Sequence, residues 1–260
     1  ILMALGLSRL VLKSGVLVKV RDAVQAKKSR PWLAVAAVVV VDAVIEGLLT
    51  LPWSAYEDWW RQKSYGLTDQ AFGGWLGETL TMVLISLIMT AALASGVYAV
   101  MRKAPRTWWA WSGGLVAVAF MVIMVLAPVF IEPLFNTYTP APAGPVRDTV
   151  VTMANANGVP SDKIYVYNGS KQSNRYTANV SGLFGTARVA MSDTMFKQGA
   201  DLAEVKGVVG HEMGHYVHMH SIWLASAFGA LALVLFFLVD RLFAPVARLL
   251  GARDISGVSD

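Results

Sequence analysis

Four long apolar segments limit what this chain can fold into. A bilayer has a hydrocarbon core about 30 Å thick, which takes roughly 20 residues of helix to cross. Each of the four segments reaches that length: residues 31–53, 75–101, 107–134 and 221–243. They predict a mainly α-helical, multi-pass integral-membrane protein.

The composition agrees with burial in lipid. The chain is 55% hydrophobic and only 15% charged, with a mean hydropathy of +0.51, whereas a soluble domain carries roughly 25% charged residues. Indole rings prefer the headgroup level, and Trp32 and Trp53 stand at the two ends of the first segment. The formal charge of +5 comes from Lys and Arg that mostly flank the apolar segments. We therefore expect a lipid bilayer as partner and no nucleic acid, and the sequence does not indicate an oligomeric state.

Charge placement also gives an expectation for orientation. Basic residues cluster before the first segment (residues 21–30) and between the second and third (residues 102–106). By the positive-inside rule these loops face the cytoplasm, which would put the polar block between the third and fourth segments on the opposite side.

That polar block has the pattern of a small α+β domain. A Pro-rich linker (residues 139–145) precedes a helical stretch (146–157) and three short β-like runs (163–167, 176–183 and 187–191), with Gly185 where a hairpin turn would fall. Asp201 and Glu204 then resemble a capping box that starts a further helix, which we expect to continue into the fourth apolar segment. We predict three parts: membrane helices and loops over 1–134, a catalytic domain over 135–220, and a membrane helix with a tail over 221–260.

The run His211-Glu212-Met213-Gly214-His215 lies on that helix. Two histidines four residues apart share one helix face and can bind one Zn²⁺. Glu212 lies about 100° around the helix, beside the ion, where a general base takes a proton from zinc-bound water. Zinc lowers the pKa of that water towards ~7 and polarises the scissile carbonyl. The motif predicts a zinc metallopeptidase with His211 and His215 as metal ligands and Glu212 as the catalytic base.

The alternative is that the two histidines are ordinary polar residues on an amphipathic helix. Context favours the metal, because all four histidines of the chain fall within ten residues and no cysteine is present to bind zinc instead. His218 and His220 do not share the face of the first pair. We interpret these two as polar interface residues or as hydrogen-bond partners of the ligands.

A third zinc ligand is missing from the pattern. A catalytic zinc takes three protein ligands and a water, and the chain offers two. The acids after His215 are Asp240, Asp254 and Asp260, and none is suitably spaced. Asp193 or Glu204 upstream is the less favoured alternative. We expect the ligand beyond residue 260, in which case the chain is a segment of a longer protein.

The run 176–183 is the candidate for substrate binding. An exposed strand edge can pair with an extended peptide, main chain to main chain, and Thr177, Ala178, Asn179 and Val180 lie at the centre of this run. The alternative is an ordinary strand of a hairpin, and composition does not decide between them.

The chain resembles the CAAX prenyl endopeptidase family of membrane gluzincins over roughly residues 45–225. Besides His211–His215, the similar segments are Leu51-Pro52-Trp53-Ser54-Ala55-Tyr56, Tyr65-Gly66-Leu67-Thr68, residues 133–140, Asp162-Lys163-Ile164-Tyr165-Val166, Gly169-Ser170-Lys171-Gln172-Ser173, Asp193-Thr194 and His220. The resemblance implies a helical barrel enclosing an aqueous chamber, an inserted zincin-like α+β catalytic domain, Zn²⁺ as cofactor, and peptide or protein substrates, including lipidated ones.

Two departures from the family stand out. The peptide-binding strand of the family contains Asn-Ala-Tyr/Phe before a glycine, whereas this chain has Thr177-Ala178-Asn179-Val180-Ser181-Gly182. The third ligand of the family is a Glu on a later helix, which is absent here. The resemblance also implies a cytoplasmic catalytic domain, against the charge count, so sidedness stays open.

Three functions therefore remain at the level of sequence. An active zinc endopeptidase is favoured. A catalytically inactive membrane scaffold or binding relative is the first alternative, suggested by the missing ligand. A transporter is the second; it predicts two similar halves with paired broken spans, which the large polar block contradicts.

Overall fold

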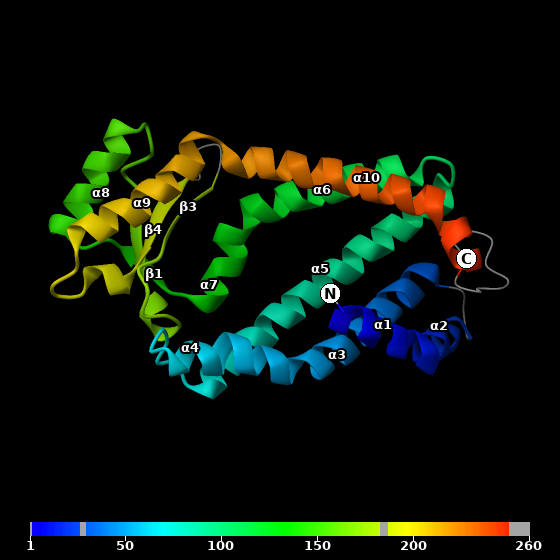
Figure 1. The fold of residues 1–260 in the computed structure, drawn as a ribbon. Coiled ribbons are helices and arrows are strands. Elements are labelled where there is room, and N and C mark those ends of the chain that lie inside the picture. Colours follow the sequence, from blue (N-terminus) through cyan, green and yellow to red (C-terminus); the bar gives the residue numbers. More distant parts are fainter. Residues whose placement is uncertain (1, 27–29, 183–186, 250–260) are drawn as a thin grey trace. The chain divides into compact units, whose positions relative to one another are not determined.

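The computed structural model describes residues 2–26, 30–182 and 187–249. The chain forms two compact units. One is made of three separate stretches of sequence and the other of two. The helical unit comprises Ile1–Ala55, Thr79–Ala119 and Ala227–Asp260, and the sheet unit comprises Tyr56–Glu78 and Phe120–Ser226. Figure 1 labels most of the helices and strands of both units.

The four apolar segments are helices. Within the described residues, four helices are long and apolar enough to cross a membrane: Pro31–Ser64, Phe72–Lys103, Trp108–Phe135 and His220–Leu249. The first consists of α3 (Pro31–Ser54), the π-helix η1 (Ala55–Trp60) and α4 (Arg61–Ser64), and the second is α5 (Phe72–Lys103). The third consists of α6 (Trp108–Leu126), the π-helix η2 (Ala127–Ile131) and α7 (Glu132–Phe135), and the fourth is α10 (His220–Leu249).

Small residues and one polar contact join the helices of the helical unit. At Gly113 of α6 an added Cβ would lie 2.5 Å from Leu233 Cδ2 on α10, so only glycine allows this approach. The acid Asp240 of α10 accepts a 2.6 Å hydrogen bond from the Trp108 indole, which gives it a partner among apolar neighbours. Two shorter helices, α1 (Leu2–Ser14) and α2 (Val16–Gln25), pack beside α3.

The sheet unit contains four strands in the order β1-β2-β4-β3. They are β1 (Tyr138–Pro140), β2 (Ile164–Tyr167), β3 (Ala178–Ser181) and β4 (Arg188–Ser192). β2 and β4 are parallel, whereas β1 on β2 and β3 on β4 are antiparallel. Among the described residues β3 pairs with β4 alone, so it is an edge strand.

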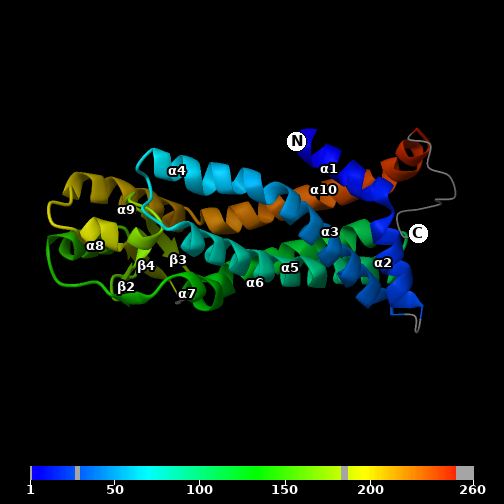
Figure 2. The same cartoon turned by 90° about the horizontal axis from the view of Figure 1, so that it is seen from below.

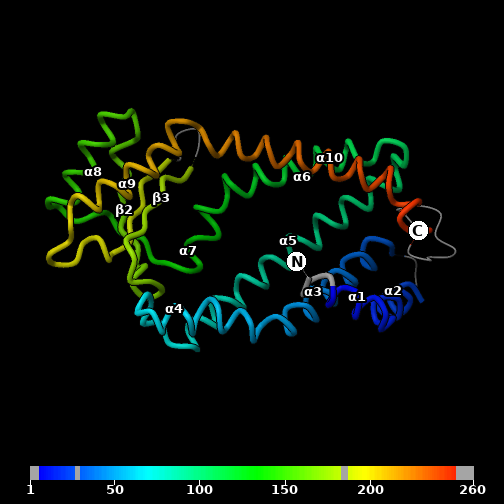
Figure 3. The backbone as a smooth tube through the Cα atoms, viewed as in Figure 1, coloured from blue at the N-terminus to red at the C-terminus, as the bar shows by residue number. Residues whose placement is uncertain are grey.

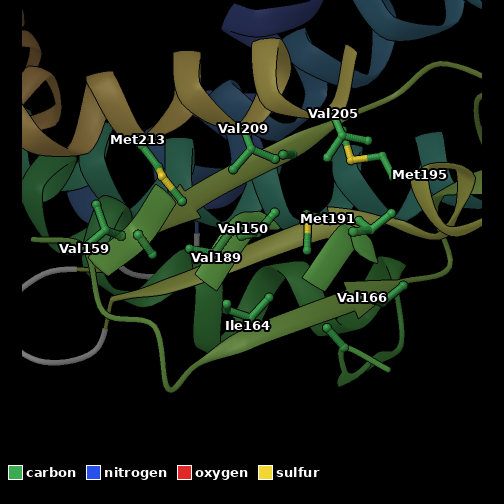
Figure 4. Close-up of a cluster of buried hydrophobic side chains, with 14 residues drawn as sticks. Val150, Val159, Ile164, Val166, Val189, Met191, Met195, Val205, Val209 and Met213 are labelled. Carbon is green, nitrogen blue, oxygen red and sulfur yellow. The ribbon is translucent and has the colours of Figure 1, made fainter. Parts of the chain in front are cut away.

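Two helices cover one face of this sheet, α8 (Pro145–Ala156) and α9 (Leu202–Val217). Figure 2 shows both helices beside the strands. Figure 4 shows Val205, Val209 and Met213 of α9 directed at the strand residues Val189 and Met191. These residues belong to one buried cluster, which also includes Val150, Ile164, Val166 and Met195. This core fixes the rotation of α9 on the sheet.

Most of the predicted elements are present in the sheet unit, with two differences. The stretch predicted as a linker contains β1, since Tyr138–Pro140 pairs with β2. The predicted continuous helix from the capping box into the fourth span is wrong, because α9 ends at Val217 and α10 begins at His220. The backbone of the two helices can be followed in Figure 3. The predicted turn at Gly185 lies outside the described residues.

Candidate active site

The helix that carries the histidines is capped and packed as its sequence requires. Asp201 precedes the first turn of α9, and its Oδ1 accepts a 2.8 Å hydrogen bond from the Ala203 backbone N–H. Val205, Val209 and Met213 recur every four residues and are buried on the sheet. His211 and His215 therefore lie on a different face of α9, and both are exposed.

The Nε2 atoms of His211 and His215 lie close together. The two Nε2 atoms lie 3.0 Å apart, and the rings stand edge to face with centroids 4.7 Å apart. Two imidazoles bound tetrahedrally to one zinc at about 2.0–2.1 Å have nitrogens about 3.3 Å apart. The pair fits as two ligands of a zinc ion with a shift of a few tenths of an ångström.

Glu212 follows His211 on the next helical position and is half-buried. A third protein ligand does not join the histidines, because the described part of the chain has no group of three His, Cys, Asp or Glu side chains suited to one metal. Asp193 accepts hydrogen bonds from the Ser170 N–H (2.7 Å) and hydroxyl (2.6 Å). Asp240 accepts from Trp108, and Glu204 is exposed in the first turn of α9.

The predicted substrate-binding residues lie on the open edge of the sheet. The Ser192 backbone N–H donates a 2.8 Å hydrogen bond to the Thr177 carbonyl. The main-chain groups of Thr177 therefore point at β4, and so do those of Asn179, two residues later. Hydrogen-bonded and non-hydrogen-bonded residues alternate along an antiparallel pair. The N–H and C=O groups of Ala178 and Val180 therefore point away from β4, to the side where no strand is described.

The side chains of β3 alternate between the two faces of the sheet. Ala178 is buried in the core cluster, and Val180 packs against it. Asn179 lies on the opposite face, where its Oδ1 is buried and has no hydrogen-bond partner among the described residues. The groups that this edge leaves unpaired within the described structure are therefore mainly those of the backbone.

A pocket of about 470 Å³ joins the end of this strand to the second histidine. Val180, Ser181 and Gly182 line one side of it and His215 another. Its remaining lining is mostly apolar and includes Met124, Ala127, Pro128, Met219 and Ile222. His211 and Glu212 are not part of the lining. The pocket therefore offers a mostly apolar surface beside His215.

A charged cluster that sequence analysis missed joins the third span to the sheet. Arg188 of β4 donates 2.8 Å hydrogen bonds to Glu132 and to the Pro128 carbonyl, and its guanidinium lies 4.3 Å from the centre of the Tyr138 ring. The Tyr138 hydroxyl donates to the same Glu132 carboxylate at 2.9 Å. Burial raises the pKa of Tyr138 well above its usual value, and the negative charge of Glu132 raises it further. The signal in the sequence was Glu132, an acid near the end of the third span, but it does not reveal Arg188 as its partner.

A second missed cluster involves the loop before α5. Asn174 donates its N–H to the Leu67 carbonyl at 2.9 Å and its side-chain amide to Asp69 at 2.8 Å. Lys171 forms a 3.2 Å ion pair with Glu78 in α5 and also donates to the Phe135 carbonyl. The two family-like segments around Gly66 and Ser170 are thus in direct contact, which neither segment shows by itself.

Comparison with known proteins gives the family of the chain. The model for the CAAX prenyl protease N-terminal region, with five membrane helices, matches residues 2–137, and the model for peptidase family M48 matches residues 140–255. The chain belongs to peptidase family M48. Because the N-terminal model describes membrane helices and four apolar spans are present, this M48 chain is an integral membrane protein, as predicted.

Similar M48 proteins come from bacteria and eukaryotes. An uncharacterized metalloprotease, YhfN of Bacillus subtilis, is 26% identical over 92% of this chain and 56% of its own length. The CAAX prenyl protease 1 homolog of Caenorhabditis elegans is 24% identical over 73% of this chain and 49% of its own length. The crystal structure of S. mikatae Ste24p matches with a TM-score of 0.76 at 22% identity, over 87% of this chain and 54% of that one.

Two facts follow from these matches. The shared fold with Ste24p confirms the predicted fold class, with membrane-spanning helices and a small inserted sheet. The chain spans about half the length of the relatives that it matches.

Proposed function

We propose that this protein is a zinc-dependent endopeptidase that cleaves membrane-associated or lipidated peptides. The observation that carries the proposal is the 3.0 Å approach of the His211 and His215 Nε2 atoms on one capped helix. Membership in family M48 supports a metallopeptidase, and the relatives named CAAX prenyl proteases support lipidated substrates.

Each residue has a separate role in the proposed reaction. His211 and His215 would hold the metal, and a Glu beyond residue 260 would complete its protein ligands. A bound zinc ion supplies a Lewis acid that polarises the scissile carbonyl and acidifies the attacking water. Glu212 takes the proton from that water and delivers it to the leaving amine.

The β3 edge holds the substrate in this proposal. The outward N–H and C=O groups of Ala178 and Val180 pair with an extended peptide, as in other strand-addition complexes. Thr177 and Asn179 keep the strand on β4. The apolar pocket beside His215 takes an apolar side chain or lipid group of the substrate.

Replacing Glu212 by Gln in the intact protein tests the mechanism. The assay is cleavage of two peptides ending in a CAAX sequence, identical except for a prenyl group on the cysteine. Glu212→Gln removes the proton carrier and should reduce kcat at least about 100-fold, while zinc content measured by mass spectrometry stays near that of wild type.

The control is Glu204→Gln, which changes an exposed acid in the first turn of the same helix and should leave cleavage unchanged. Full cleavage by Glu212→Gln would refute the assigned base. A zinc-loaded wild-type protein that cleaves neither peptide would favour the scaffold alternative. Faster cleavage of the prenylated peptide is the expected result for the lipid preference.

A further inference from the structure

The connection between α9 and α10 has an unusual backbone. Met219 adopts a φ of 51°, and it is the one non-glycine residue with positive φ in the part of the chain that the structure describes. Residues other than glycine rarely adopt this left-handed backbone conformation, and it persists only where the surrounding structure holds it. The Met219 N–H donates to the Tyr216 carbonyl, and the Met219 carbonyl accepts from Ile222 in the next helix.

This turn brings His220 back towards the metal ligands. In an uninterrupted helix a residue five positions after His215 lies about 140° around the axis from it. With the left-handed Met219, the His220 Nδ1 instead lies 2.9 Å from the His215 Nδ1. The two rings stand edge to face with centroids 4.9 Å apart.

The atoms involved separate this contact from metal binding. His215 uses Nε2 towards His211 and Nδ1 towards His220. These nitrogens lie on opposite sides of Cε1 in the ring, so His220 contacts the side of His215 that faces away from the shared metal position. His220 is therefore placed behind a ligand rather than beside it.

We propose that His220 is a positioning residue that fixes the ring orientation and tautomer of His215 for zinc. Two ring nitrogens 2.9 Å apart share one proton. A metal-binding His215 presents the lone pair of Nε2 to the ion, so its proton resides on Nδ1, and His220 accepts that proton through its own Nδ1. Ligating histidines usually donate their second N–H to such a partner, and loss of the partner costs 10–100-fold in metal affinity.

His218 provides the internal comparison. Its ring stacks on His220 with centroids 5.7 Å apart, but no hydrogen bond joins it to His211 or His215 in the described structure. His218 and His220 are both exposed and two residues apart. Their hydrogen bonds therefore distinguish these two otherwise similar histidines.

The test measures zinc affinity of the intact protein, independently of cleavage. His220→Ala should weaken zinc binding by about 10–100-fold in a competition titration with a chelating dye. His220→Asn restores an acceptor close to the position of Nδ1 and should recover most of the affinity. His218→Ala should remain within a factor of about 3 of wild type. The visible spectrum of the Co²⁺-substituted protein should change in His220→Ala and return towards wild type in His220→Asn.

The outcomes separate this inference from the proposed function on which it rests. If wild-type protein does not bind zinc, or His211→Ala binds it equally well, the metal site itself is refuted. If zinc binds through His211 and His215 but His220→Ala binds it as tightly as wild type, only the role of His220 is refuted. Equal loss in His220→Ala and His220→Asn would also overturn it, because the acceptor would then not matter.

Discussion

Arg188 shows how one residue can join a membrane helix to the sheet. Pro133 has no N–H, so the carbonyl five residues earlier, that of Pro128, lacks its partner in the π-helical stretch η2. Arg188 donates to that carbonyl and to Glu132, both at 2.8 Å. Both bonds come from Nη2, and the guanidinium plane also covers the Tyr138 ring, a contact that the shorter lysine with its single ammonium does not reproduce.

This arrangement predicts the effect of Arg188→Lys. The side chains of Arg188 and Glu132 are only 17% and 23% exposed, so the shorter reach of lysine and the loss of a charged hydrogen bond should cost about 1.5–3 kcal/mol of stability. Thermal unfolding of the detergent-solubilised protein measures the change. Arg61→Lys is the control, because its pair with Glu57 is 43% and 39% exposed and should be worth less than about 1 kcal/mol. Equal shifts in the two variants would contradict the role of Arg188.

At the scale of elements, local patterns predicted what depends on local physics. Four apolar runs predicted four helices, which the structure contains. The cap at Asp201 and the spacing of His211 and His215 predicted α9 and the shared helix face on which the two histidines lie. The patterns failed where the outcome depends on a distant partner. β1 is a strand because β2 lies beside it, although Pro140 looks like linker. The break at Met219 has no glycine or proline to signal it. The third metal ligand was not found in the described part of the chain.

The register of β3 gives a sharp prediction for one element. Val180→Pro removes an N–H that points to the open edge, which an edge strand tolerates, and Asn179→Pro removes one that pairs with β4. The first variant should keep the unfolding temperature near that of wild type and raise KM for the CAAX peptides about 2- to 10-fold, as expected for one lost hydrogen bond. The second should lose about 1–3 kcal/mol of stability. If Val180→Pro cleaves the CAAX peptides with an unchanged KM, the proposal that the peptide pairs with the β3 edge is wrong.

For the whole molecule, the count of spans sets which loops share a side of the membrane. Two spans separate the loop around Gly66 from the sheet, so both belong on one side, which agrees with the hydrogen bonds between Asn174 and that loop. The basic loop at 102–106 lies one span away from each and belongs on the other. The positive-inside rule places that basic loop in the cytoplasm, whereas the family resemblance places the catalytic domain there.

Single cysteines resolve this conflict, because the chain has no cysteine of its own. Tyr65→Cys, Thr107→Cys and Gln198→Cys are all at exposed positions. In sealed vesicles, a membrane-impermeant maleimide should label Tyr65→Cys and Gln198→Cys from the same side and Thr107→Cys from the opposite one. Cytoplasmic labelling of Gln198→Cys would show that the sheet unit follows the family and that the few basic residues do not set the orientation. Labelling of Tyr65→Cys and Gln198→Cys from opposite sides would contradict the count of spans, since two helices between them return the chain to its starting side.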